Sequence, residues 1–202
     1  MGVKLNLFCE GQSVLTCRAN LPEGPERCRR LARYLEETER VWQARWEKKL
    51  YPMACEALGA GRLFRPWTAE LTGEETCRDE MFYSMRLEAR EVRGDGRPCL
   101  VCWGLIWRIK EDAPVNVENF FHRGKGLENQ ILKRIFRDGT ARQRENLWFP
   151  DGDWQEKAKK ALKACSPWID EKSVFWSFPQ GFMADSAEGT PVFGVEREDL
   201  SP

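Results

Sequence analysis

The residues with the clearest chemical potential in this sequence are eight cysteines and a single histidine. Cys99 and Cys102 form a C-x-x-C pair, a spacing at which a tight turn can direct two sulfur atoms to one zinc ion or one redox centre. Here the pair lies in an apolar run typical of a β-strand, where side chains three residues apart point to opposite faces. The sequence has no second C-x-x-C and no paired histidines. We therefore predict no metal and no cofactor.

The cysteines as a group are too scattered to resemble the disulfide framework of a small secreted domain. Their even number permits disulfides, but their spread favours free, mostly buried thiols. The eight positions are Cys9, Cys17, Cys28, Cys55, Cys77, Cys99, Cys102 and Cys165.

The histidine, His122, could act as a general base, because its ordinary pKa lies near neutrality. Its cationic neighbours Arg123 and Lys125 should lower that pKa, and no partner can be assigned to it from the sequence. We interpret His122 as an ordinary loop residue. The sequence also lacks the G-x-S-x-G, Walker and G-x-G-x-x-G patterns, so we predict no catalytic residue.

Paired carboxylates leave one enzymatic alternative open, a small hydrolase or transferase with an unrecognised active site. A glycosidase needs two carboxylates at a defined separation across a cleft, and sequence spacing does not supply that separation. The candidate acids are Asp79, Glu80, Asp151 and Asp153.

Nine tryptophans are many for 202 residues. Tryptophan suits sugar stacking and protein interfaces, and it also fills the space between a sheet and its helices. Those on apolar faces of expected elements, such as Trp42 and Trp103, are predicted to lie in the core. Trp148, Phe149 and Trp154 are flanked by polar residues, so we predict that they are exposed and bind a ligand.

Charge argues against a nucleic-acid partner. The chain carries 32 basic and 32 acidic residues, which gives a formal net charge of zero. The cations of an expected long helix between residues 27 and 49 are interleaved with glutamates, which is typical of a solvated helix face. The electrostatic signature of a nucleic-acid binder is missing.

Apolar runs such as Leu100 to Trp107 are shorter than the ~20 residues that a membrane helix requires, so we expect no membrane span. The first ten residues alternate in polarity and lack the apolar core of a secretory signal. The sequence as written is expected to be cytoplasmic, and extracytoplasmic if a leader has been removed from it.

The expected elements begin with strands at residues 3–9 and 13–19, joined at Gly11 in a hairpin. A long amphipathic helix follows between residues 27 and 49, and Pro52 should end or kink it before a short helical piece at 53–59. The alternating run 82–92 is expected to form a strand that turns at Gly94 to Gly96 into the strand 99–109.

The second half is expected to contain a helix at about 126–137 and a second helix that is capped by Asp153 and ends near Cys165. Strands follow at 173–178, 182–184 and 191–196. Tight turns between strands predict an α+β fold, with a mostly antiparallel sheet and helices packed on one face. We expect a single domain over 1–202, in which a strand and helix module at 1–78 is integrated with a module at 79–202.

Three segments of the second half carry a family resemblance. They are an aromatic segment at 118–121 before a helix, an aromatic strand at 174–178 that turns through Gly181, and a closing segment at 195–200. Together they resemble the domain of unknown function found at the C-terminus of the lysozyme-sensing anti-sigma factor and beside bacterial polysaccharide deacetylases. The Gly-Gly-Ala-His type of loop common in that family is absent.

The resemblance implies a non-enzymatic α+β module of the bacterial cell envelope, and it assigns no individual binding residue. Our leading interpretation is a bacterial binding or sensing domain whose partner is a protein or an envelope glycan. Exposed aromatic side chains should distinguish it from the enzymatic alternative.

Overall fold

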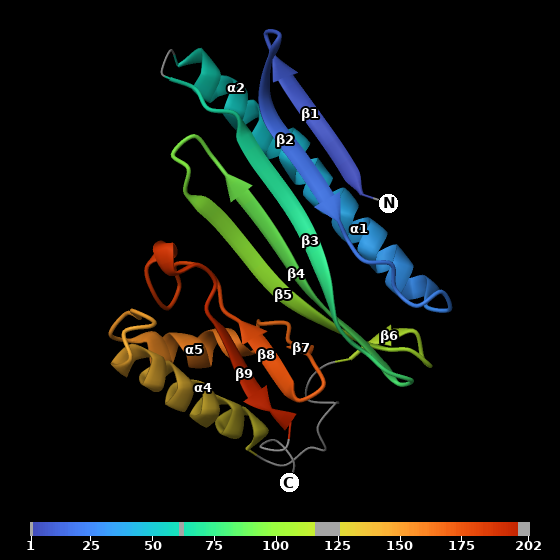
Figure 1. Cartoon of the computed structure of the whole chain (residues 1–202), viewed down its shortest axis with the longest axis vertical. Helices are drawn as coiled ribbons and strands as arrows, with labels where there is room; N and C mark the ends of the chain where they lie inside the picture. The colour runs from blue at the N-terminus through green and yellow to red at the C-terminus, as the bar shows by residue number, and fades with distance from the viewer. Residues whose placement is uncertain (1, 61–62, 116–125, 198–202) are drawn as a thin grey trace. The chain divides into compact units, whose positions relative to one another are not determined.

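The computed structural model describes residues 2–60, 63–115 and 126–197. His122 lies outside the described residues, as do the segments 118–121 and 198–200 of the resemblance. The chain divides into two compact units (Figure 1). Unit 1 comprises Met1–Glu74 and Glu88–Leu100, and unit 2 comprises Glu75–Leu87 and Val101–Pro202.

Unit 1 opens with the predicted hairpin. Strand β1 (Val3–Cys9) pairs antiparallel with β2 (Gln12–Asn20). Glu10 and Gly11 connect them with φ angles of 50° and 81°. Two consecutive positive φ values are what a tight hairpin turn requires, and glycine adopts one of them without strain.

The helical segment of unit 1 continues through its proline. Helix α1 (Arg29–Arg45) passes into a π-helical turn (Trp46–Leu50) and then into α2 (Tyr51–Gly59). Pro52 has no N–H group and its ring crowds the preceding turn. In the widened turn, the backbone N–H of Tyr51 donates to the Trp46 carbonyl, five residues back. The helix therefore neither ends nor breaks at Pro52, because a π turn accommodates the proline.

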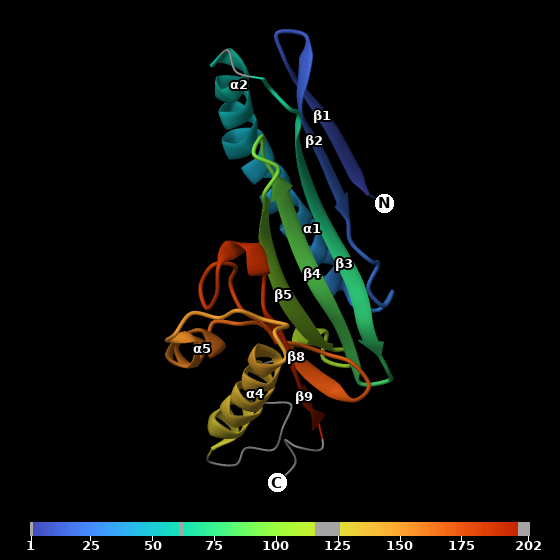
Figure 2. The ribbon, with the colours of Figure 1, turned by 60° about the vertical axis from the view of Figure 1, so that its left-hand side comes forward.

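Strand β3 (Trp67–Arg78), which the sequence analysis did not identify, begins in unit 1. It pairs parallel with β2, in a register that runs from Leu15 opposite Trp67 to Asn20 opposite Thr72. A parallel pair needs a long crossover connection, and the helical segment supplies it. Alternate residues of both strands are buried, and α1 and α2 lie along one face of these strands (Figures 1 and 2).

Strands β4 (Phe82–Val92) and β5 (Pro98–Arg108) form the second predicted hairpin, and their unit 1 ends carry a buried carboxylate. The Glu91 side chain is only 3% exposed. Arg45 of α1 donates to both of its oxygens, from Nε at 2.7 Å and from a terminal nitrogen at 2.9 Å. This hydrogen-bonded pairing raises the pKa of Arg45. A buried carboxylate requires such a partner, so the pair fixes α1 to β4 within unit 1.

Unit 2 contains the other ends of β3, β4 and β5, with the short strand β6 (Ala113–Pro114) beside β5. Helices α4 (Leu127–Arg144) and α5 (Trp154–Leu162) follow. They lie beside an antiparallel sheet of β7 (Trp168–Ile169), β8 (Ser173–Ser177) and β9 (Val192–Glu196), as Figure 1 shows. A single turn of 3-10 helix, Ser186–Glu188, precedes β9. The core of unit 2 is rich in aromatic side chains, including Trp148, Trp154, Trp176, Phe178 and Phe193.

A close backbone approach joins β5 to the segment that leads into β7. The N–H of Gly104 donates to the Ser166 carbonyl at 2.7 Å. A Cβ atom at Gly104 would lie 2.2 Å from the carbonyl carbon of Pro167, so only glycine fits there. Next to this contact, the buried Ser84 hydroxyl accepts from the Ile169 N–H at 2.9 Å and donates to the Leu105 carbonyl at 3.1 Å. Backbone groups that would otherwise be unpaired in the core are thus satisfied.

Several sequence predictions for unit 2 are corrected. The segment 182–184 is not the return strand of a hairpin with β8, because β8 pairs with β7 and β9, and only an isolated bridge joins Ala184 to Pro150. Helix α4 continues to Arg144, beyond the expected end near 137. Asp153 precedes α5 but makes no side-chain cap hydrogen bond, because its carboxylate pairs with Lys157 at 3.1 Å.

The predicted α+β class is confirmed. Strands β1 to β6 follow one another in sequence order in a mixed sheet, and the second sheet is antiparallel. Among the pairings with an assigned register, only β2 with β3 is parallel.

We expect the Arg45→Met substitution to lower the free energy of unfolding by about 2 kcal/mol, because a hydrogen bond to a charged group contributes ~1.5–3 kcal/mol. The variant leaves Glu91 buried with the Arg93 guanidinium 3.9 Å away. Urea denaturation followed by tryptophan fluorescence measures the change. Arg40→Met, which removes the exposed Arg40–Glu37 pair, is the matched control, with an expected change within ~0.5 kcal/mol. An equal decrease in the free energy of unfolding in the two variants would contradict the structural role assigned to the Arg45–Glu91 pair.

The Gly104→Ala substitution should destabilise the protein by about 3 kcal/mol or more, since the new methyl group meets backbone atoms that cannot rotate away. Gly152→Ala adds the same methyl group where no atom lies within 4 Å, and it should change stability little. Thermal unfolding of both variants tests the contact. A Gly104→Ala protein as stable as Gly152→Ala would show that β5 and residues 166–168 do not approach so closely.

Candidate functional site

The three residues predicted to bind a ligand differ in how far they are exposed to solvent. Trp148 and Trp154 are each only 5% exposed, so the expectation that they lie at the surface is wrong. Their rings meet edge to face, with centroids 5.0 Å apart, and both pack against Phe193. Gly139 of α4 provides the space, because a Cβ there would lie 2.6 Å from the Trp154 ring. Phe149 is 61% exposed, and it is the member of the predicted set that a partner can reach.

Phe149 lies on one of two neighbouring segments of unit 2 that carry exposed apolar side chains. The residues from Leu147 to Pro150 alternate outward and inward, so Leu147 points outward with Phe149 and is 69% exposed. The bridge between Pro150 and Ala184 places residues 181–184 beside this segment, and the Asp151 N–H donates to the Met183 carbonyl at 2.8 Å. Phe182, 37% exposed, lies on that neighbouring segment. We call Leu147, Phe149 and Phe182 the Phe149 patch.

Three of the four candidate carboxylates, Asp79, Asp151 and Asp153, have structural partners. Lys157 lies 2.7 Å from Asp151 and 3.1 Å from Asp153, and these contacts raise the pKa of Lys157. Asp79 accepts from the N–H groups of Met81 and Phe82 at 2.7 and 2.6 Å, which closes the turn between β3 and β4. These interactions stabilise the start of α5 and the turn between β3 and β4. They do not arrange the carboxylates as a pair of catalytic acids.

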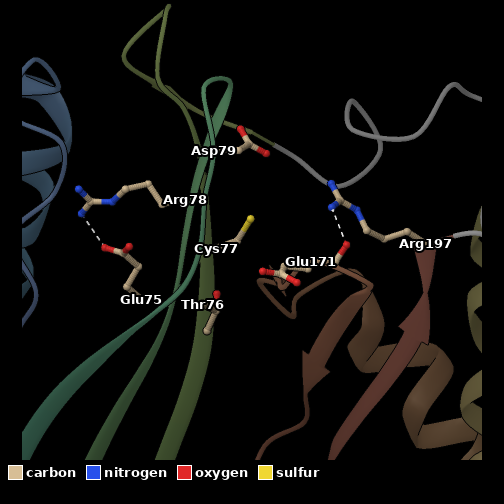
Figure 3. Close-up of a pocket in the computed structure, with 7 residues that line it drawn as sticks. All are labelled: Glu75, Thr76, Cys77, Arg78, Asp79, Glu171 and Arg197. Carbon is tan, nitrogen blue, oxygen red and sulfur yellow. Dashed lines mark hydrogen bonds and ion pairs between the residues drawn. The ribbon is translucent and has the colours of Figure 1, made fainter.

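A polar cavity of about 470 Å³ lies in unit 2 beside the end of β3 (Figure 3). Glu75 and Arg78 pair across 2.6 Å, and the Arg78 guanidinium lies 5.2 Å from the Tyr83 ring centroid. Arg197 donates to the backbone carbonyls of Asp170 and Glu171 at 3.4 and 3.3 Å. The lining residues are Glu75, Thr76, Cys77, Arg78, Asp79, Glu171 and Arg197.

The sequence pattern does not predict this group of residues: Asp79 was a candidate acid, Cys77 was one of the scattered thiols, and the other lining residues had no predicted role. Residues 75–79 are contiguous, but Glu171 and Arg197 come from distant segments. The missed strand β3 concealed the grouping, since without it nothing placed Glu75 and Cys77 near Glu171.

The described residues that line the cavity include groups for binding but no activated nucleophile. Burial raises the pKa of the Cys77 thiol, and the nearby Asp79 carboxylate adds to this effect. A raised pKa lowers the thiolate fraction at neutral pH, the opposite of what a catalytic cysteine requires. Guanidinium and carboxylate groups can still hold a polar ligand by hydrogen bonds and ion pairs.

The C-x-x-C pair is confirmed to point to opposite faces of β5, since Cys99 is exposed and Cys102 is buried. All eight cysteines are free thiols, but only Cys17, Cys28 and Cys102 are buried, so the expectation of mostly buried thiols is wrong. In the described part of the chain, no group of three or more potential metal ligands comes together. None of the helices described is long and apolar enough to cross a membrane.

No family model and no curated protein matches the sequence. Solved structures do match. A member of the DUF3298 family from Bacteroides fragilis aligns over 98% of this chain and 89% of its own length, with a TM-score of 0.60 and 10% identity. The chain has the fold of DUF3298 proteins. A DUF3298 protein from Pseudomonas aeruginosa aligns over 100% of this chain and 96% of its own, with a TM-score of 0.58 and 11% identity.

DUF3298 denotes a domain of unknown function, so the chain shares its fold with such a domain, and the association with the anti-sigma factor or the deacetylases stays a prediction. At sequence identities near 10%, no functional residue of these proteins can be assigned to a position of this chain. A shared fold alone does not define an activity. Functional inference for this chain therefore depends on its own surface.

Alkylation kinetics test the view that Cys77 is not a nucleophile. We expect iodoacetamide at pH 8 to modify Cys77 more slowly than the exposed Cys99, because a raised pKa leaves less thiolate. The Cys77 rate should still rise with pH between 8 and 9.5, since its thiolate fraction is far from saturation there. Peptide mapping by mass spectrometry gives both rates. A Cys77 rate above that of Cys99, and independent of pH in this range, would indicate an activated thiolate.

Proposed function

We propose that this chain is a non-enzymatic binding or sensing domain of a bacterial cell-envelope protein, that it acts outside the cytoplasm, and that its partner is a protein. The observation that carries the proposal is the Phe149 patch. Aromatic side chains at the centre of an exposed patch are the typical anchors of protein interfaces.

The construction of the patch supports a role in recognition. Trp148 is buried between Leu147 and Phe149, and its ring packs against Trp154 and Phe193. The backbone that carries the outward side chains is therefore held by well-packed core residues. Less conformational entropy is lost when a partner binds to such a rigid segment.

A protein partner is favoured over an envelope glycan by the kinds of side chain involved. Sugar recognition combines a flat aromatic ring with polar groups that hydrogen-bond the hydroxyls. The other exposed side chains of the Phe149 patch, Leu147 and Phe182, are apolar, and among the described residues none that lines the polar cavity is aromatic. A protein surface can complement an apolar patch of this type.

The enzymatic alternative draws no support from the cavity. Its thiol has a raised pKa, and the carboxylate of Asp79 closes a turn. The groups that line the cavity are those of a polar binding site.

Titration of intrinsic tryptophan fluorescence tests the proposal, because Trp148 lies next to Phe149 in the chain and reports on the patch. The panel contains lysozymes and soluble peptidoglycan fragments, which the family resemblance suggests as protein and glycan candidates. We expect a saturable change with a protein, and we expect Phe149→Ser to weaken that binding at least about tenfold, as hot-spot residues do.

Met81→Ser is the matched control, since it removes another exposed apolar side chain, in the turn between β3 and β4, outside the patch. It should bind as the unsubstituted protein does. Saturable binding of peptidoglycan fragments instead of proteins would support the glycan alternative, and equal weakening by both substitutions would show that the patch is not the contact surface.

A further inference from the structure

Two half-buried thiols of unit 1 come together at the end of the β1–β2 hairpin. Cys9 is the last residue of β1, opposite Gln12, and Cys55 lies in the middle of α2. Figures 1 and 2 show the hairpin turn beside α2. Neither thiol is fully buried, whereas Cys17 in the same unit is.

Helix geometry and one hydrogen bond explain why these residues meet. The Tyr51 hydroxyl, in the first turn of α2, donates to the carbonyl of Phe8 at 2.7 Å. That bond ties one face of α2 to the residue before Cys9. Cys55 lies four residues after Tyr51, on the same helix face one turn further along, so its thiol also faces the end of β1.

The side-chain contacts agree with this placement. The Cys55 side chain lies within interaction range of both the Cys9 thiol and the Tyr51 hydroxyl. The contact with Cys55 raises the pKa of Cys9, followed by a smaller effect of burial. Two neighbouring thiols on separate elements can approach to the S–S distance of ~2.05 Å when side chains or backbone adjust.

We propose that Cys9 and Cys55 are a redox-active pair that a small-molecule disulfide such as oxidised glutathione converts to an intramolecular disulfide. One thiol of the pair loses its proton and attacks a glutathione sulfur, breaking the glutathione disulfide, forming a mixed disulfide and releasing one glutathione thiolate. The second protein thiol then loses its proton and attacks the protein sulfur of the mixed disulfide, releasing the other glutathione thiolate. Two protons and two electrons pass from the protein to glutathione, which leaves as two molecules of reduced glutathione.

The disulfide links the end of β1 to α2 and closes the chain from residue 9 to residue 55. Constraining a loop of this size stabilises the folded state relative to the unfolded chain. In the thiol form the Tyr51 hydrogen bond to Phe8 joins these elements without a covalent link, so oxidation stiffens the hairpin end of unit 1. The inference does not rest on the Phe149 patch, which belongs to unit 2.

The test equilibrates the full-length protein in glutathione buffers of increasing oxidised fraction at pH 8, followed by acid quenching and non-reducing peptide mapping. We expect a Cys9–Cys55 linked peptide and a rise of roughly 10 °C in the thermal midpoint on oxidation. Cys99→Ser, which removes the exposed thiol of the same unit, should leave both results unchanged.

Cys9→Ser should abolish the linked peptide and the thermal shift, and leave Cys55 as a glutathione mixed disulfide. Tyr51→Phe removes the bond to Phe8 and should shift the equilibrium toward the thiols at least about threefold. Recovery of glutathione adducts on Cys9 and Cys55 without a link between them would overturn the proposal, as would a thermal shift that persists in Cys9→Ser.

Discussion

The close approach of Gly104 to the backbone of residues 166–168 is the constraint on which the organisation of unit 2 depends. At this point β5 meets another chain segment with no side chain between them, and the Gly104 N–H is satisfied by Ser166. The Ser84 hydroxyl then pairs with backbone groups on both sides, one from Leu105 and one from Ile169. Because β7 is fixed here, β8 and β9 follow it by antiparallel pairing. The aromatic core that supports Phe149 packs against that sheet.

The periodicity of the sequence was sufficient to predict the helices and strands that have one buried and one solvent-exposed face. The hairpin at 3–19, the long helix and the hairpin of β4 and β5 were all found in this way, because alternation and helical spacing report burial directly. Strand β3 was missed because its second half, from Gly73 onward, is only partly buried and combines two glutamates with Thr76, Cys77 and Arg78. Its parallel pairing with β2 is a tertiary property that no local pattern contains.

The candidate site was predicted only in part, for a physical reason. Trp148, Phe149 and Trp154 share a polar sequence context, and that context indicated exposure for all three. Burial of the two tryptophans depends on Gly139 of α4, whose missing side chain makes room for their rings. A contact between a glycine and residues more than a helical turn away along the chain cannot be deduced from composition. The polar cavity was missed for a related reason, because β3 meets Arg197 only in three dimensions.

Hydrogen–deuterium exchange of the protein with and without each member of the lysozyme and peptidoglycan panel tests the central claim most directly. If the Phe149 patch is the recognition surface, a protein ligand should slow exchange in residues 146–153 and 181–188 and leave residues 75–79 unchanged. Protection confined to residues 75–79, with the patch segments exchanging as in the free protein, would contradict the account and assign recognition to the polar cavity.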